Sequence, residues 1–165
     1  MARLNCDPYG GFHLFALTNR VTALLHSGEA VTAMVKALEA DGVATGDIEI
    51  FTGEDGAKCL DLPGREHGRA IHLLRTLEAT MGDERETNLR IDAALRKGAS
   101  LVCVKVPATL PAMMHAIAHP SSLATFRKQK SDEKDRAFRV FRAQRAHEIH
   151  YWGAWSFEDM PPSSS

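Results

Sequence analysis

The chain has few cysteines, and it lacks the motifs that mark a well-known chemistry. Cys6, Cys59 and Cys103 are widely spaced and form no CxxC pair. This spacing indicates neither a disulfide framework nor a zinc ribbon, and it is consistent with a reducing compartment. The sequence also lacks a Walker loop, a GxGxxG or GxSxG motif and a Ser-His-Asp order. Because nothing argues for catalysis, we expect a non-enzymatic protein and name no cofactor.

The chain also lacks an excess of one charge and any long apolar run. Its 20 basic and 21 acidic residues give a net charge of −1, whereas binding the phosphates of nucleic acid requires a clear basic excess. No apolar stretch approaches the ~20 residues of a membrane-spanning helix. The first residues, MARLNCDPYGG, lack the apolar core of a secretory signal. We therefore expect a cytoplasmic protein that binds neither nucleic acid nor membranes.

What is present is ordinary globular composition, with 165 residues of which 44% are hydrophobic and 25% charged. This length fits one domain over 1–165. Within it we expect an N-terminal extension at 1–18, an insertion at 107–130 and a frayed tail at 160–165. Whether residues 12–17 add a strand is not decided by their pattern.

Apolar periodicity and turn signals divide the rest of the chain into strands and helices. Ser27 is a natural N-cap for the first helix, and Gly42 is a natural left-handed end for it. The run LVCVKV is almost entirely apolar, as in a central strand. We expect strands at 20–26, 47–51, 101–106 and 147–157, and further helices at 66–81, 83–98 and 131–146.

This order of elements predicts an α+β fold with a ferredoxin-like split βαβ arrangement. The sheet would be antiparallel with helices on one face. Extra helices would lie between the second and third strands, and the insertion would follow the third. The other face of the sheet would be solvated or covered by something else.

The stretch HEIHYWGAW, residues 147–155, combines two histidines with three large aromatic residues. On a strand, His147 and His150 would point to opposite faces, which makes HEIH a poor metal motif. His150 and Trp152 would lie on the open face of the sheet. Because large exposed apolar patches are often interfaces, we predict that these two residues line a homodimer interface. The insertion could cover them instead, or they could form a ligand platform.

His115 and His119 stand four residues apart in MMHAIAH, and on a helix they would share a face. The glutamate of an HExxH motif is missing, and zinc needs three or four ligands. A third ligand could come from His26, His67 or His72. We keep a metal site here as an alternative to surface histidines.

The turn TGEDG follows one strand and precedes a helix, so its backbone amides could hold an anion. Gly53, Glu54 and the nearby His67 form a weak ligand-site prediction. The two acidic residues of the turn would oppose a phosphate, and they could instead stabilise the start of the helix.

Three arginines, Arg136, Arg139 and Arg142, lie opposite the apolar side of the helix expected at 131–146. They could bind an acidic partner, or they could be the solvated side of an amphipathic helix.

The segments DIEIFTGEDGAKCLDLPGREHG, MGDERE and YWGAWSFEDM resemble a poorly characterised group of small bacterial proteins. That group is similar to heat-induced or general-stress-protein domains. The resemblance covers roughly residues 19–106 and 132–160, and it implies a ferredoxin-like fold and a link to stress physiology, without a defined reaction. We therefore expect a stress-associated domain that acts through homodimerisation or protein interaction. The alternative is a small-molecule or metal-binding protein, with an enzyme among the options, that uses the histidines near 107–130.

Overall fold

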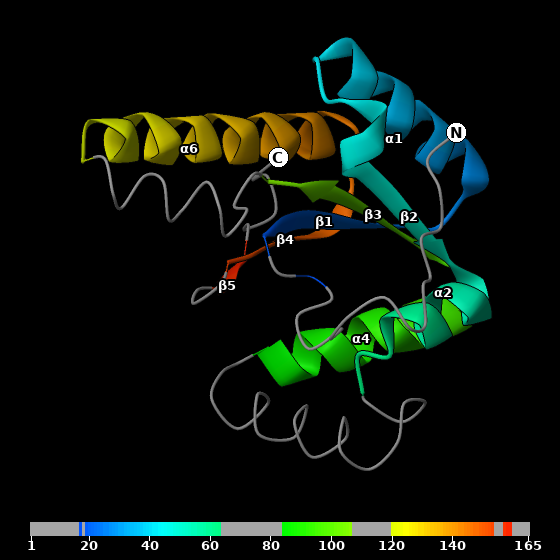
Figure 1. Ribbon diagram of the computed structural model, residues 1–165. Helices are drawn as coiled ribbons and strands as arrows, with labels where there is room; N and C mark the ends of the chain where they lie inside the picture. The colour runs from blue at the N-terminus through cyan, green and yellow to red at the C-terminus, as the bar shows by residue number, and fades with distance from the viewer. Residues whose placement is uncertain (1–16, 18, 64–83, 107–119, 154–156, 160–165) are drawn as a thin grey trace.

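The computed structural model describes residues 17, 19–63, 84–106, 120–153 and 157–159. In these ranges the chain is α+β, with a five-stranded sheet and several helices (Figure 1). The elements are β1 (Arg20–Leu25), α1 (Gly28–Ala40), the 3-10 helix η2 (Thr45–Asp47), β2 (Ile48–Thr52), α2 (Gly53–Leu60), α4 (Glu84–Arg96), β3 (Ser100–Lys105), α6 (Pro120–Ala143), β4 (His147–Trp152) and β5 (Phe157–Asp159).

The sheet has the strand order β2-β3-β1-β4-β5, and every neighbouring pair is antiparallel. The predicted antiparallel α+β sheet is therefore confirmed. β1 lies at its centre between β3 and β4, so its residues alternate between two covered faces.

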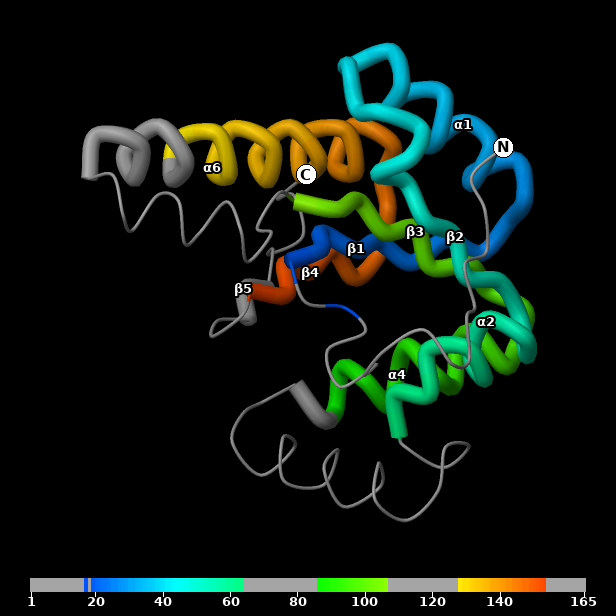
Figure 2. The backbone as a smooth tube through the Cα atoms, viewed as in Figure 1, coloured from blue at the N-terminus to red at the C-terminus, as the bar shows by residue number. Residues whose placement is uncertain are grey.

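Helices cover both faces of the sheet, which corrects the prediction of helices on one face only. α1 and α6 lie on one side, called the upper face here, and α2 and α4 lie on the other, the lower face (Figures 1 and 2). Leu24 and Leu101 point to the lower face and pack with Ile91 and Leu95 of α4. The extra helices between the second and third strands thus close the face that we expected to be open.

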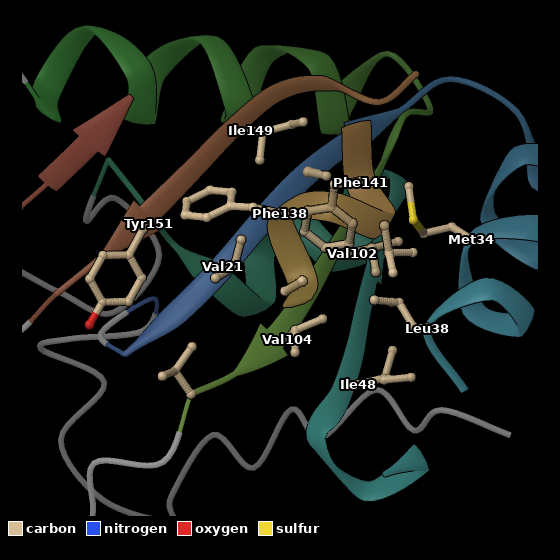
Figure 3. Close-up of a cluster of buried hydrophobic side chains, with 14 of the residues drawn as sticks. Val21, Met34, Leu38, Ile48, Val102, Val104, Phe138, Phe141, Ile149 and Tyr151 are labelled. Carbon is tan, nitrogen blue, oxygen red and sulfur yellow. The ribbon is translucent and has the colours of Figure 1, made fainter. Parts of the chain in front are cut away.

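The upper face carries the larger apolar cluster (Figure 3). Phe141 of α6 and Met34 and Leu38 of α1 are fully buried against it. The strands contribute Val21, Ala23, Leu25, Ile48, Val102, Val104, Ile149 and Tyr151.

α1 begins and ends where its sequence signals predict. The Ser27 hydroxyl accepts a hydrogen bond from the Ala30 amide at 3.1 Å, as an N-cap residue does. Gly42 follows the helix with φ +90°, a conformation that glycine adopts without steric cost.

Two predicted boundaries are wrong. α6 begins at Pro120 rather than at Ser131, so part of the expected insertion belongs to a long helix. Proline suits the first helical position, because that position has no intrahelical partner for an amide. The single strand expected at 147–157 is wrong as well, because β4 ends at Trp152 and β5 returns antiparallel to it.

Several predictions fall outside the described residues. These are the helix at 66–81, the possible strand at 12–17, His67, His72, His115, His119 and the tail at 160–165. No helix in the described part of the chain is both long and apolar enough to cross a membrane.

Candidate ligand-binding site

A row of polar positions crosses the lower face of the sheet. The strand register places Glu49 opposite Cys103, Cys103 opposite Thr22, and Thr22 opposite His150. Residues directly opposite one another on neighbouring strands share a face. Thr22 and Cys103 are fully buried, and Glu49 and His150 are 9% and 4% exposed. Buried polar residues are informative because they need partners.

Glu49 has two cationic partners from neighbouring strands. Its carboxylate accepts a hydrogen bond from Arg20 Nε at 2.8 Å and forms an ion pair with Lys105 Nζ at 3.0 Å. Burial by itself raises the pKa of Glu49, but the hydrogen bonds and charges of Arg20 and Lys105 outweigh it and hold the pKa below its ordinary value. Through these two contacts, Glu49 of β2 connects the three strands β1, β2 and β3.

Trp152 donates a hydrogen bond from its indole nitrogen to the Thr22 hydroxyl at 3.0 Å. Trp152 is only 6% exposed and belongs to the same apolar cluster as Leu17, Ile91 and Leu95. The prediction that Trp152 and His150 form an exposed interface patch is therefore corrected, because the single chain already buries both side chains.

Cys103 lies in the middle of the polar row, but it is unsuited to nucleophilic chemistry. Burial raises the pKa of its thiol far above the ordinary range, which keeps the sulfur protonated. Cys103 is a free thiol, whereas Cys59 is disulfide-bonded. The disulfide corrects the expectation that the cysteines remain reduced.

An open depression of about 390 Å³ lies beside the C-terminal end of α4, next to the end of β1 and the start of β4. Its polar lining comes from three elements or their ends: His26, Arg90, Lys97 and Glu148. Its walls are otherwise small residues, namely Ala93, Ala94, Gly98 and Ala99. Small walls let a ligand approach the backbone closely.

A β-bulge places Glu148 in the depression. Leu24 pairs with His147 and Thr22 pairs with His150, so β4 has one more residue than β1 between these pairs. Glu148 takes up the difference with φ 48°, in the left-handed region that side chains other than glycine rarely adopt. Bulges that redirect a side chain are enriched next to functional sites.

The Glu148 carboxylate is only partly used within the protein. One oxygen, Oε1, lies 3.9 Å from Arg90 Nε. The other, Oε2, is buried and has no hydrogen-bond partner. A buried acceptor that lacks a donor is costly for the folded state, and a bound donor would remove that cost.

Arg90, Lys97 and His26 line the same depression as this carboxylate. Arg90 also donates to the Thr87 hydroxyl at 3.2 Å, whereas Lys97 is exposed and forms no ion pair with another described residue. The rings of His26 and His147 lie 5.9 Å apart, tilted by 50°. Within the described ranges, no three His, Cys, Asp or Glu side chains are grouped closely enough to hold a metal ion.

The residues of the predicted TGEDG site are engaged inside the protein. The Gly53 amide donates to the Ala99 carbonyl at 3.1 Å, and Glu54 accepts from Arg96 Nη1 at 2.7 Å. Gly56 allows α2 to fold back on β2, because a Cβ there would lie 2.8 Å from the Phe51 backbone. The turn thus packs α2 against the sheet and α4, which argues against the predicted anion role.

The arginines of α6 also have an internal partner. Asp41, after the end of α1, lies 3.3 Å from Arg139 Nη2 and 3.8 Å from Arg136 Nε. An acidic partner at this surface, which would include Arg142, stays a prediction, and it would compete with Asp41.

Sequence reasoning therefore missed the residues that line the depression. The HEIH stretch, residues 147–150, includes Glu148, but the alternation of its side chains predicted no role for that residue. A bulge depends on the length of the neighbouring strand, so no local pattern reveals it.

Comparison with protein-family models, with curated proteins and with solved structures found no match.

Proposed function

We propose that this protein binds a small zwitterionic molecule in the depression between α4 and the start of β4. The ligand would carry an acidic group and a hydrogen-bond donor such as an ammonium. The observation that carries the proposal is the buried Glu148 Oε2, which lacks a donor and lies in the same depression as two cations. These groups present opposite charges to one small ligand.

The chemistry of each side chain defines the ligand. A carboxylate accepts hydrogen bonds, so the unpartnered oxygen of Glu148 selects a donor. Arg90 and Lys97 are donors only, and both favour an anionic group. An amino acid or a similar zwitterion meets both demands at once, whereas a simple anion would meet the charge of Glu148 unfavourably.

The fold supports this proposal by bringing two cations of α4 and its C-terminal turn to the same depression as a carboxylate of β4. Arg90 is on α4, Lys97 follows α4, and Glu148 lies on the bulge of β4. We also propose that β1 to β4 form a ferredoxin-like split βαβ unit. The order β2-β3-β1-β4 with antiparallel neighbours supports this assignment.

The proposal favours the ligand-binding alternative over an interface at His150 and Trp152, whose side chains are buried. Homodimerisation, a link to stress physiology and a cytoplasmic location stay predictions. The proposed function is binding without catalysis.

The test is a thermal-shift screen of the purified protein with the standard L-amino acids as probes. A ligand at about 100 times its Kd stabilises the folded state by about 2.7 kcal/mol, which is readily detected. We expect a subset of amino acids to raise the Tm. Glu148→Gln and Lys97→Met should reduce that rise, and the exposed control Lys128→Met should retain it. A flat screen, or equal responses in all variants, would contradict the proposal.

A further inference from the structure

The three charged residues of the depression differ in how far they reach into water. The side chain of Glu148 is 31% exposed and that of Arg90 is 50% exposed, and Lys97 is an exposed residue. One carboxylate oxygen of Glu148, Oε2, is buried, although the residue lines the depression. A ligand that enters from solvent therefore meets the cations at the rim and the carboxylate deeper inside.

Arg90 is already engaged by groups of the protein. Its guanidinium lies 3.9 Å from Glu86 Oε1 and 3.9 Å from Glu148 Oε1, and it donates to the Thr87 hydroxyl at 3.2 Å. Because the side chain is half exposed, water and salt weaken its attraction for a further anion. The exposed Lys97 is screened in the same way. Cations of this kind add modest affinity for an acid group.

Glu148 Oε2 makes a different demand on the ligand. No group donates a hydrogen bond to it, and the other oxygen of the carboxylate has only the long contact with Arg90. The cost of a buried acceptor without a donor is removed only by a ligand that brings an N–H or O–H group. An ammonium with an N–H brings both a donor and the opposite charge, which makes a charge-assisted hydrogen bond. A positive charge without a hydrogen does not meet this demand.

The remaining walls of the depression place no polar side chain against a ligand. They consist of Ala93, Ala94, Gly98 and Ala99. Ligand sites generally combine apolar walls with a few polar groups that fix the orientation of the ligand. An aliphatic side chain on the ligand is compatible with these walls, so the charged residues decide which head group is selected.

We infer that the depression requires an ammonium with an N–H, and that the acid group of the ligand adds to binding without being required. The ammonium donates to Glu148 Oε2, and the carboxylate lies near Arg90 and Lys97 at the rim. The ligand class is aliphatic amino acids and, more weakly, the amines that share their side chains. A quaternary ammonium carries the same charge without an N–H, so it binds poorly. This inference rests on the proposed function and adds which half of the zwitterion is selected.

Calorimetric titration with leucine and its derivatives tests the inference. L-leucine carries both groups, isoamylamine only the ammonium, and isocaproate only the carboxylate. N,N,N-trimethyl-L-leucine keeps both charges but has no N–H, and N,N-dimethyl-L-leucine is nearly as bulky but keeps one N–H. We expect leucine to bind best, isoamylamine to bind more weakly and isocaproate not to bind. The trimethyl compound should bind about tenfold or more weakly than the dimethyl compound, because it cannot donate to Oε2.

Two variants separate the roles of the charged residues. Glu148→Gly removes the carboxylate at a position whose φ of 48° suits glycine, so it should abolish the binding of leucine and isoamylamine. The free variant should be at least as stable as the wild type, because it also loses the unpartnered oxygen. Lys97→Met should weaken leucine more than isoamylamine. The exposed Lys128→Met on α6 is the control and should bind both as the wild type does.

The outcomes distinguish this inference from the proposed function. If the trimethyl compound binds as tightly as the dimethyl compound, or isocaproate binds more tightly than isoamylamine, the inference is overturned and the zwitterion proposal stands. If isoamylamine binds as tightly as leucine, the zwitterion proposal fails and the inference stands. A clear loss of stability in free Glu148→Gly would overturn the inference, because Glu148 would then serve the fold. If no compound of the series binds, the inference is overturned and the amino-acid screen alone decides the proposed function.

Discussion

The two faces of the sheet use the same strands differently. On the upper face, β1 and β3 contribute only aliphatic side chains to the core cluster, and these pack with Phe138 and Phe141 of α6. On the lower face, Thr22, Cys103 and Glu49 replace aliphatic residues at the middle of the sheet. The upper face is stabilised by apolar packing, and the lower face depends on paired polar groups as well.

This contrast separates structural polar groups from candidate binding groups. Glu49 and Thr22 have partners on neighbouring strands, and they connect the sheet. Several buried polar atoms of the described residues lack a hydrogen-bond partner, and among them Glu148 Oε2 belongs to a residue that lines an open depression. Glu148 is the candidate binding group because its unpartnered oxygen coincides with a depression that a small ligand can enter.

The largest expected effect comes from the upper face. Phe141→Ala should lower the free energy of unfolding by about 3–5 kcal/mol, because it leaves a cavity in a fully buried position. Urea unfolding monitored by circular dichroism measures this change. Phe141→Leu is the control and should cost clearly less. A loss below about 1 kcal/mol for the alanine variant would show that the upper face is not tightly packed.

The second effect is on the lower face and depends on pH. Glu49→Gln should lower the free energy of unfolding at pH 7 by about 1–3 kcal/mol, since it weakens the contacts with Arg20 and Lys105. The folded-state pKa of Glu49 lies below its ordinary value of 4.5. Its stabilising contribution is therefore complete above pH 4.5 and disappears as the pH falls through the folded-state pKa.

Urea unfolding of wild type and Glu49→Gln across this range measures that dependence. The stability difference between the two proteins should shrink below pH 4.5. A difference that stays constant with pH would mean that the charge of Glu49 does not stabilise the sheet.

A smaller effect is expected where Thr22 meets Trp152. Thr22→Val keeps the shape of the side chain but removes the acceptor of the indole nitrogen, so stability should fall by about 1–2 kcal/mol. Thermal unfolding provides the measurement. Thr32→Val on the exposed side of α1 is the control and should change little. If Thr22→Val were as stable as the wild type, the hydrogen bond from Trp152 would not stabilise the fold.

The smallest expected effect is the chemical modification of the Cys103 thiol in the folded protein. Burial keeps its thiol protonated and out of reach of reagents, so iodoacetamide at pH 8 should not modify it in the folded protein. The same treatment in urea should modify it fully, and mass spectrometry distinguishes the two cases. Rapid labelling of the folded chain would mean that the lower face opens to solvent.

The sequence predicted the strands and the ends of α1 because those features depend on local patterns. Alternation marked Val21 and Ala23 as core residues, and Ser27 and Gly42 as helix ends. The second layer of helices was missed, although LVCVKV carried its signal. A strand that is apolar at nearly every position is typical of a sheet covered on both faces.

The start of α6 and the candidate sites were harder to predict. Polar residues dominate the segment 120–131, so apolar periodicity could not show that the helix begins at Pro120. The position of Glu148 depends on one extra residue relative to β1, and the contact of Lys130 with Tyr151 depends on how α6 crosses the sheet. These relations exist only in the folded chain.

The most direct measurement is a map of backbone amide chemical shifts during titration with the amino acid that raises the Tm most. We expect saturable shifts at His26, at residues 90–98 and at His147 and Glu148, with Tyr151 unaffected. Shifts confined to other residues, or no saturable shift for any amino acid, would contradict a zwitterion site at the bulge of β4.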